Sequence, residues 1–164
     1  IVASIKRDLT EVSRLNEKIL IIDDDVSVRQ VLSSILSEKG YLVATVQNGK
    51  QALKAAEKEH FDLALIDVVL PGIKGTDLLH KLKERQPRMV KIMVTGFPSL
   101  ETTIKAVNEG ADGYILKPLN PKELLKTIRK HLDEKATEYL RIRAEIEESN
   151  KFAEQFKKPK GSIF

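Results

Sequence analysis

Short apolar runs alternate with amphipathic stretches along most of this chain. Five runs have the length and β-branched content of buried strands, at residues 18–22, 42–46, 63–66, 91–94 and 113–116. Between them, apolar residues recur every three or four positions, as they do on one face of a helix. The alternation predicts an α/β domain in which a five-stranded, doubly wound parallel sheet is covered by helices on both faces.

Residues that typically begin or end helices frame the amphipathic stretches. Three of these stretches end near Gly40, Pro87 and Gly110, and Pro121 stands where a helix can begin. The apolar positions that define the five predicted helices fall within residues 28–36, 52–56, 78–82, 103–107 and 124–132. Helices of this kind are the usual connections between parallel strands.

The helical pattern continues after Leu132 and meets no glycine or proline until Pro159. Steps of three and four residues connect most of its apolar positions, which are Ala136, Tyr139, Ile142, Ile146, Ala153 and Phe156. We therefore predict an N-terminal arm at residues 1–16, one domain at 17–132, and a helical extension with a basic tail at 133–164. The extension is either a linker or dimerising helix, or a tail that packs back on the domain.

Composition narrows the class of protein. The chain has 164 residues, of which 41% are apolar, which suits one domain with a core. Its apolar runs are too short to span a membrane, no signal peptide is evident and cysteine is absent, which fits a cytoplasmic protein. The net charge is +4, but basic residues alternate with Asp and Glu except at 157–160, so we expect no direct contact with nucleic acid.

Acidic residues stand at the carboxyl ends of two predicted strands. Asp23, Asp24 and Asp25 follow the first strand, and Asp67 follows the third. Ligands of parallel α/β sheets bind at this edge of the sheet. Adjacent carboxylates repel one another unless a cation lies between them, and Mg²⁺ prefers oxygen ligands. We therefore predict a magnesium site on Asp67 and on Asp23 or Asp24, with a backbone carbonyl after Asp67. Asp25 is expected to cap the following helix.

Two further strand ends offer groups that suit a phosphoryl group. Thr95 supplies a hydroxyl, Gly96 an accessible backbone N–H, and Lys117 an ammonium group. Pro118 can make a cis peptide bond that aims Lys117. A carboxylate such as Asp67 can attack a phosphoryl donor and form an acyl phosphate when cations hold the oxygens of the transferred group.

Taken together, these pieces resemble the receiver domain of two-component response regulators, of the chemotaxis-regulator-like kind. The resemblance covers residues 17–132 and implies a flavodoxin-like sheet with strand order 2-1-3-4-5. Its motifs are Ile21-Ile22-Asp23-Asp24-Asp25, Leu65-Ile66-Asp67, Leu70-Pro71-Gly72-Ile73-Lys74-Gly75, Met93-Val94-Thr95-Gly96 and Gly113-Tyr114-Ile115-Leu116-Lys117-Pro118.

The resemblance implies a role for each residue of the site. Asp67 would be the phosphoacceptor, with a sensor histidine kinase or a phosphotransfer protein as donor. Asp24 would bind Mg²⁺ directly, Asp23 through water, and Val69 through its carbonyl oxygen. The phosphoryl group would be contacted by Thr95, Gly96 and Lys117.

The family also implies a switch rather than an enzyme, since the domain would promote only its own phosphorylation and dephosphorylation. Thr95 would move toward the phosphoryl group, and Tyr114 would fill the space behind it. The surface formed by the fourth helix, the last strand and the fifth helix would change in response. Partner binding or a homodimer, through this face or through the C-terminal helix, would follow.

Two positions distinguish this chain within the resemblance. Val69 lies two residues after Asp67, and Phe97 lies two residues after Thr95. In the family these positions flank the path of the water that hydrolyses the acyl phosphate. Because both side chains are apolar, nothing there orients a water molecule for attack. We therefore expect slow loss of phosphate.

The sequence supports three other functions less well. An aspartyl-nucleophile phosphatase resembling the haloacid dehalogenases could use Asp23-Asp24-Asp25 as its Asp-x-Asp motif, but the chain has little room for the usual cap. A module that never takes phosphate is disfavoured by Asp67, Thr95 and Lys117 together. A DNA-binding regulator would need more residues than follow Leu132. Residues 6–11 resemble the end of a PAS sensor domain, or form a free amphipathic arm.

Overall fold

Strands and helices alternate through residues 16–157, which are the residues that the computed structural model describes. The elements are β1 (Lys18–Ile22), α2 (Val26–Glu38), β2 (Leu42–Val46), α3 (Gly49–Lys58), β3 (Leu63–Asp67), α4 (Gly75–Arg85), β4 (Val90–Thr95), α5 (Leu100–Asn108), β5 (Gly113–Leu116) and α6 (Pro121–Gln155). The predicted alternation is confirmed. The N-terminal arm, with its PAS-like stretch, and most of the basic tail lie outside the described residues.

The five strands form one parallel sheet in the order β2-β1-β3-β4-β5. This is the flavodoxin-like order that the resemblance implied. In its register Ile22 pairs with Ile66, and Asp67 pairs with Val94. The chain segments that leave β1 and β3 therefore emerge side by side, at the edge of the sheet where ligands bind in such folds.

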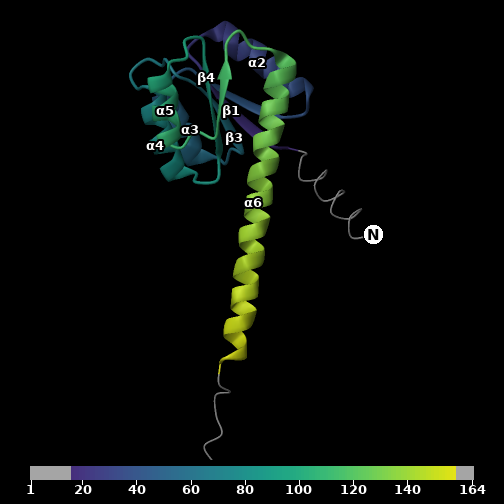
Figure 1. Ribbon diagram of the computed structural model, residues 1–164. Coiled ribbons are helices and arrows are strands. Elements are labelled where there is room, and N and C mark those ends of the chain that lie inside the picture. The colour runs from purple at the N-terminus through teal and green to yellow at the C-terminus, as the bar shows by residue number, and fades with distance from the viewer. Residues whose placement is uncertain (1–15, 158–164) are drawn as a thin grey trace, which may run out of the picture. The chain divides into compact units, whose positions relative to one another are not determined.

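Two apolar cores lie on opposite faces of the sheet. On one face α3, α4 and α5 pack against alternate strand residues, and the core there includes Leu20, Ile66, Leu79 and Met93. On the other face α2 and the first part of α6 cover a core that includes Ile21, Leu36, Ile92 and Ile128. Figure 1 shows the two groups of helices on either side of the strands. Burial on both faces explains why β1, β3 and β4 read as continuous apolar runs.

The strands extend slightly further than the sequence predicted. β3 includes Asp67, and β4 runs from Val90 to Thr95, whereas the predicted strands ended at residues 66 and 94. The reason is that ladder hydrogen bonds depend on the neighbouring strand and not on the polarity of the end residue. Asp67 and Thr95 thus belong to the rigid sheet, which holds their side chains in place.

Helix ends follow the expected chemistry. Asp25 caps α2, because its Oδ1 accepts hydrogen bonds from the backbone N–H groups of Ser27 and Val28 at 2.8 and 3.3 Å. Gly40 follows the helix with φ of +91°, a conformation that favours glycine. α5 begins with a capping box between Ser99 and Thr102.

The last helix, α6, spans 35 residues, so the long helix predicted past the domain is present. Contacts divide the chain into two units, one ending at Leu132 and one beginning at Asp133. In the first unit, Leu124, Ile128 and Leu132 of α6 are buried in the core. None of the helices in the described part of the chain is both long and apolar enough to cross a lipid bilayer.

Candidate metal centre

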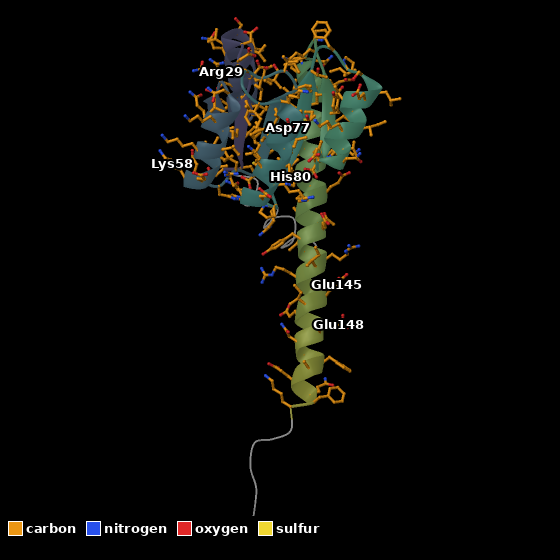
Figure 2. All side chains as sticks on the ribbon, turned by 90° about the vertical axis from the view of Figure 1, so that its left-hand side faces the viewer. Arg29, Lys58, Asp77, His80, Glu145 and Glu148 are labelled. Carbon is orange, nitrogen blue, oxygen red and sulfur yellow. The ribbon has the colours of Figure 1, made fainter. Side chains whose placement is uncertain are left out.

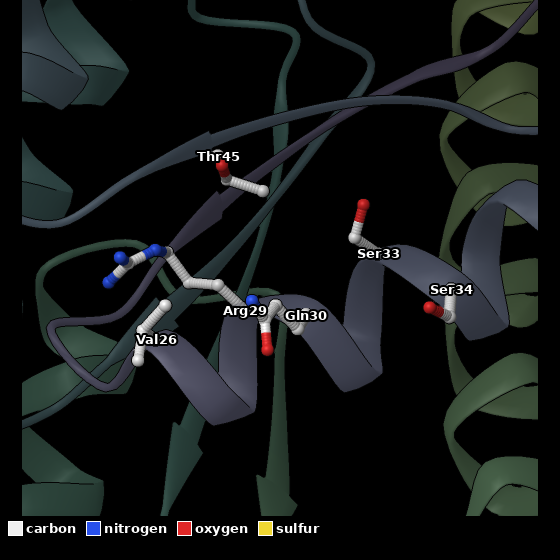
Figure 3. Close-up of a pocket in the computed structure, with 6 residues that line it drawn as sticks. All are labelled: Val26, Arg29, Gln30, Ser33, Ser34 and Thr45. Carbon is white, nitrogen blue, oxygen red and sulfur yellow. The ribbon is translucent and has the colours of Figure 1, made fainter.

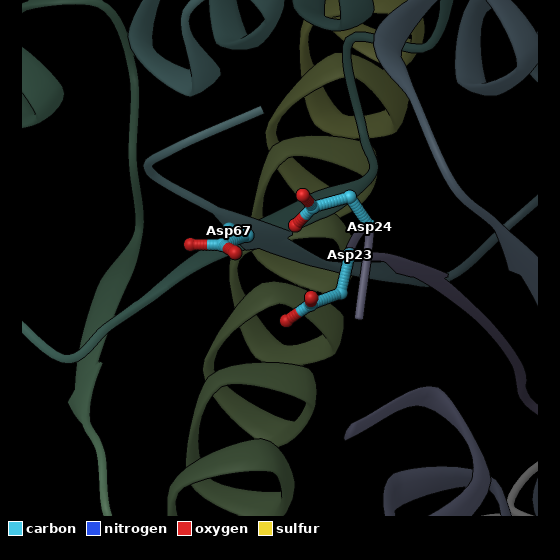
Figure 4. A group of neighbouring side chains, drawn as sticks. All are labelled: Asp23, Asp24 and Asp67. Atoms are coloured by element: carbon cyan, nitrogen blue, oxygen red, sulfur yellow. The ribbon is translucent and has the colours of Figure 1, made fainter. Parts of the chain in front are cut away.

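Three carboxylates converge at the carboxyl edge of the sheet. Oxygens of Asp23, Asp24 and Asp67 lie within 4.8 Å of one another (Figure 4). Asp23 and Asp67 are buried, with 2% and 9% of their surfaces exposed, while Asp24 is exposed to solvent. The pairing of β1 with β3 brings Asp67 to Asp23 and Asp24, although more than forty positions separate it from them in the sequence. The cluster has the oxygen-only composition that Mg²⁺ prefers.

Backbone groups fix the two buried carboxylates. Asp23 Oδ1 accepts a hydrogen bond of 2.9 Å from the backbone N–H of Asp25. Asp67 Oδ1 accepts one of 3.2 Å from the backbone N–H of Val69. Each carboxylate therefore keeps its second oxygen, Oδ2, for a cation.

Lys117 supplies that cation. Its Nζ lies 3.1 Å from Asp23 Oδ2 and 3.6 Å from Asp67 Oδ2. The peptide bond between Lys117 and Pro118 is cis, and the backbone N–H of Lys117 donates to the carbonyl oxygen of Thr95 at 2.7 Å. The hydrogen bond holds the turn after β5 beside the end of β4, at the edge of the sheet that carries the acidic cluster.

Burial and charge act in opposite senses at this site. Burial raises the pKa of Asp67, and the negative charges of Asp23 and Asp24 add to that effect, against the hydrogen bond from Val69 and the charge of Lys117. Burial by itself would lower the pKa of Lys117, but its hydrogen bond to Asp23 and the negative charges of Asp23 and Asp67 together raise it. Lys117 is therefore held as a cation, and the ionised form of Asp67 is disfavoured by its burial.

A divalent cation suits this donor set. One lysine against three carboxylates leaves excess negative charge in a partly buried place. Asp23, Asp24 and Asp67 could share in holding the ion, with water completing its coordination. Val69 contacts the site through its N–H, and its carbonyl remains a ligand predicted from sequence alone.

Thr95 and Gly96 complete the carboxyl edge at the end of β4. Thr95 is 1% exposed, and its Oγ1 accepts a hydrogen bond of 3.2 Å from the backbone N–H of Phe97. The hydroxyl proton of Thr95 can therefore be donated elsewhere. A Cβ added at Gly96 would lie 3.8 Å from Lys117 Cβ, which is an ordinary contact. Crowding therefore does not require glycine at this position.

Tyr114 lies one strand away from the site, on β5. It packs against the core under α3, α4 and α5, and its hydroxyl is buried without a hydrogen-bond partner among the described residues. The residue as a whole is half-buried, and its hydroxyl is on the buried side. The proposed movement of this ring into the space behind Thr95 remains a prediction from the resemblance.

The side chains of Val69 and Phe97 lie at the surface. Val69 is 68% exposed and Phe97 is 87% exposed. Both are thus outside the packed core, on the loops that follow the two strands carrying Asp67 and Thr95. Two large apolar groups on these loops leave no polar side chain at either position.

Two further residues contribute to the site without having been assigned a role from the sequence. A Cβ at Gly75 would overlap the carbonyl oxygen of Asp67, so only glycine lets α4 begin this close to β3. Arg29 donates from Nη1 to the backbone oxygen of Asp23 at 2.7 Å. The turn-forming Gly72 and Gly75 after the strand were a usable signal for the close approach, whereas an arginine on a helix carries no such signal.

A hollow of about 630 Å³ lies beside α2 and β2 (Figure 3). It is lined by Val26, Arg29, Gln30, Ser33, Ser34 and Thr45. Arg29 is the charged member of this set, and none of the six carries a carboxylate. The hollow therefore adds no acidic metal ligand to the cluster at the sheet edge.

Comparisons with known proteins agree on one family. The family described as "Response regulator receiver domain" matches residues 19–129. The DNA-binding response regulator MtrA of Mycolicibacterium paratuberculosis is 34% identical over 136 residues, covering 81% of this chain and 60% of MtrA. MtrA of Mycobacterium tuberculosis H37Rv gives the same identity, with 59% of its length covered. The chain thus spans about three fifths of these curated relatives.

Solved structures show the same fold. A CheY-like response regulator receiver domain protein from Methanospirillum hungatei is 44% identical, with a TM-score of 0.73, and the match covers 75% of this chain and 98% of that one. A Burkholderia pseudomallei response regulator with a phosphorylated aspartic acid, a calcium ion and citrate is 31% identical, with a TM-score of 0.67. That match covers 76% of this chain and 73% of the other.

Proposed function

This chain belongs to the response regulator receiver domain family of two-component systems, and from that premise we propose that Asp67 accepts a phosphoryl group from a histidine kinase or phosphotransfer protein. One observation carries the proposal, namely that Lys117 Nζ lies 3.6 Å from Asp67 Oδ2 within a cluster of three carboxylates. A buried carboxylate, a lysine cation and an acidic cluster thus meet at one point, and this supports phosphoryl transfer there.

In the proposed reaction a carboxylate oxygen of Asp67 attacks the phosphorus of a phosphohistidine. A P–O bond to Asp67 forms while the P–N bond breaks, and its electron pair returns to the imidazole ring of the donor. Lys117 and the hydroxyl of Thr95 hold the phosphoryl oxygens, where charge is greatest in the transition state. The raised pKa of Asp67 also means that its anion is poorly stabilised before the reaction, which favours its conversion to an acyl phosphate.

Mg²⁺ is the proposed cofactor, and when bound it neutralises the negative charge of the phosphoryl oxygens and the carboxylates. Asp24 and Asp67 would hold it directly, with Asp23 as a water-mediated ligand and the Val69 carbonyl as a further one. The convergence of the three carboxylates within 4.8 Å supports this assignment.

The proposed output is a change of surface. Thr95 on β4 and Tyr114 on β5 lie on neighbouring strands, so movement of the Thr95 hydroxyl toward a phosphoryl group would alter the space next to the Tyr114 ring. The face formed by α5, β5 and the start of α6 carries exposed apolar residues that suit a partner or a second copy. They include Ile104, Val107 and Leu116.

Acetyl phosphate tests the acceptor directly. The chain is incubated with acetyl phosphate and Mg²⁺, and intact mass spectrometry and light scattering are recorded. We expect one phosphate adduct on the unaltered chain, none on Asp67→Asn and none without a divalent ion. No adduct on the unaltered chain, or an equal adduct on Asp67→Asn, would refute the proposal.

We also propose that the chain has no turnover beyond its own phosphate. The rival phosphatase function would release phosphate from an added ester such as p-nitrophenyl phosphate, and we expect no release.

We further propose that this chain makes no direct contact with DNA. The proposal is limited to this stretch, because the MtrA relatives are DNA-binding regulators and the match covers three fifths of their length. Ion pairs such as Arg85 with Glu57 and Lys105 with Asp77 support it, because they occupy basic groups. A gel-shift assay with duplex DNA checks this point.

A further inference from the structure

The part of α6 after Leu132 carries an apolar stripe with a seven-residue repeat. In the notation a to g, Tyr139, Ile146 and Ala153 occupy successive a positions, and Ile142 occupies a d position. The next apolar d position in sequence is Phe156, which lies in the turn directly after the last helical residue, Gln155. Ile142, Ile146 and Phe156 are 42%, 55% and 69% exposed. The described residues of this unit form one helix up to Gln155 and then a turn, and a single helix cannot bury a stripe on itself. Such an a/d stripe is the packing surface of a coiled coil.

Charged residues flank the stripe in a complementary way. Glu138 occupies a g position and Arg143 the following e position, and these positions face each other across a parallel two-stranded coiled coil. The Arg143 guanidinium lies 5.9 Å from the centre of the Tyr139 ring, so it borders the stripe. Glu145, the next g residue, projects from the same helix (Figure 2) and would face Asn150, which is uncharged.

We propose that residues 138–155 form a parallel, in-register coiled coil with the same segment of a second copy of this chain. Ile142 and Ile146 would pack against their own counterparts. Two symmetric pairs would join Glu138 of each copy to Arg143 of the other. This arrangement deepens the proposed function by naming the partner of the C-terminal helix, and it does not depend on phosphate at Asp67.

Two polar residues limit the strength of the seam. Ser149 occupies the d position between Ile142 and Phe156, and Lys135 occupies the d position before Tyr139. The apolar seam therefore begins at Tyr139 and is only a few turns long. The dimer should accordingly dissociate on dilution, and a charge placed in the seam should have a large effect.

A chain without cysteine permits a direct test of orientation. Ile142→Cys places a thiol on the seam, and Leu140→Cys places one on the same helix at a b position, away from it. Under mild oxidation we expect disulfide-linked dimers from Ile142→Cys and only monomers from Leu140→Cys. An antiparallel pair would set the two introduced thiols of Ile142→Cys far apart. Equal cross-linking of both variants, or cross-linking of neither, would overturn the proposal.

Sedimentation of the full chain tests the seam without cross-linking. Ile146→Glu should raise the dimer dissociation constant by more than about tenfold, because it places two carboxylates in an apolar seam. Leu140→Glu, an equivalent change of an exposed residue off the seam, should leave it unchanged. A monomer at all concentrations, or equal effects of the two substitutions, would contradict the inference. Circular dichroism verifies that both variants keep their helix content.

A charge exchange tests the register. Glu138→Arg and Arg143→Glu should each weaken the dimer, and the double variant should restore it, since the pairs re-form with reversed sign. Failure of restoration would overturn the proposed register. All of these measurements are made without phosphate. A negative result would therefore leave the role of Asp67 intact, and a failure of phosphorylation would leave the seam intact.

Discussion

The buried carboxylate of Asp67 lowers the stability of the fold, although the proposed chemistry requires it. The side chain is 11% exposed, and burial raises its pKa. A raised pKa means that the folded protein favours the protonated form, so the ionised carboxylate opposes folding. An aspartate whose pKa is lowered by charged or hydrogen-bonding partners has the opposite effect, because its ionised form stabilises the fold. Asp67 is thus retained at a cost to stability, which is typical of functional residues.

Replacing Asp67 with asparagine should therefore stabilise the fold. Asp67→Asn keeps the size of the side chain and the oxygen that accepts from Val69 N–H, but it removes the buried charge. At pH 7 and without divalent ions, we expect the free energy of unfolding in urea to rise by up to about 1 kcal/mol, because the penalty of the buried charge is partly offset by the ion pair with Lys117 that is lost. A less stable variant under these conditions would contradict this account.

The pH dependence of that difference has a definite sign. Between the ordinary pKa of 3.8 and the raised value, the folded state binds a proton that the unfolded state has released. The contribution of Asp67 to stability therefore falls as pH rises through this window, and the advantage of Asp67→Asn appears there. Below pH 3.8 the two chains should differ little. Added Mg²⁺ should narrow the gap at pH 7, because it binds only the folded site.

Val69 and Phe97 are expected to set the lifetime of the phosphate. Both are exposed, on the loops that follow the acceptor strand and the Thr95 strand. Val69→Asn with Phe97→Glu introduces groups that can orient water, and we expect phosphate loss to accelerate by on the order of tenfold. Release of inorganic phosphate after removal of acetyl phosphate measures the rate. An unchanged phosphate lifetime in the double variant would show that these positions do not control phosphate loss. The two single variants show how much each position contributes to the change in lifetime.

Among the elements, the junction between β3 and α4 is the most constrained. α4 begins at Gly75, whose backbone N–H donates to the carbonyl oxygen of Val68 at 3.1 Å. A side chain there would overlap the Asp67 carbonyl oxygen. The position of the acceptor strand and the start of the helix are therefore coupled.

Gly75→Ala should lower the free energy of unfolding by about 2 kcal/mol, because it forces a rigid backbone contact apart. Gly96→Ala is the matched control, since its added methyl would meet Lys117 at an ordinary 3.8 Å. We expect the control to stay within about 0.5 kcal/mol of the unaltered chain. Urea denaturation measures both. Equal effects of the two substitutions would show that crowding at Gly75 is not the reason for glycine there.

For the whole molecule, the two units of the chain have different sources of stability. The unit that ends at Leu132 has two apolar cores, whereas the described part of the second unit is one helix with exposed apolar side chains. The helix α6 is continuous across both units. The core should therefore fold without the extension, provided that its own part of α6 is kept.

Two truncations test this division. A chain that ends at Leu132 should unfold in urea within about 1 kcal/mol of the full chain. A chain that ends before Ile128 loses Ile128 and Leu132, and it should be less stable by roughly 3 kcal/mol or more, since each buried aliphatic side chain contributes about 1.5–3 kcal/mol. If the first truncation is as damaging as the second, the division at Leu132 is wrong.

Much of the molecule follows from local sequence alone. The period of apolar residues predicts every strand and helix of the described fold, because burial on two faces or on one stripe leaves a repeating pattern. Asp25 as a helix cap and the long reach of α6 are likewise local matters. Carboxylates at the ends of two strands were visible for the same reason, since a strand end is marked by the end of an apolar run.

Only the tertiary structure decided how these parts meet. Lys117 and Asp23 are 94 positions apart, and the strand order and the turn after β5 bring their charges to 3.1 Å. The burial of the Tyr114 hydroxyl and the overlap that excludes a side chain at Gly75 also depend on distant packing. The sequence determined which groups are present and at which strand ends. Non-local packing determined their distances, and electrostatic interactions at this site depend on those distances and on burial.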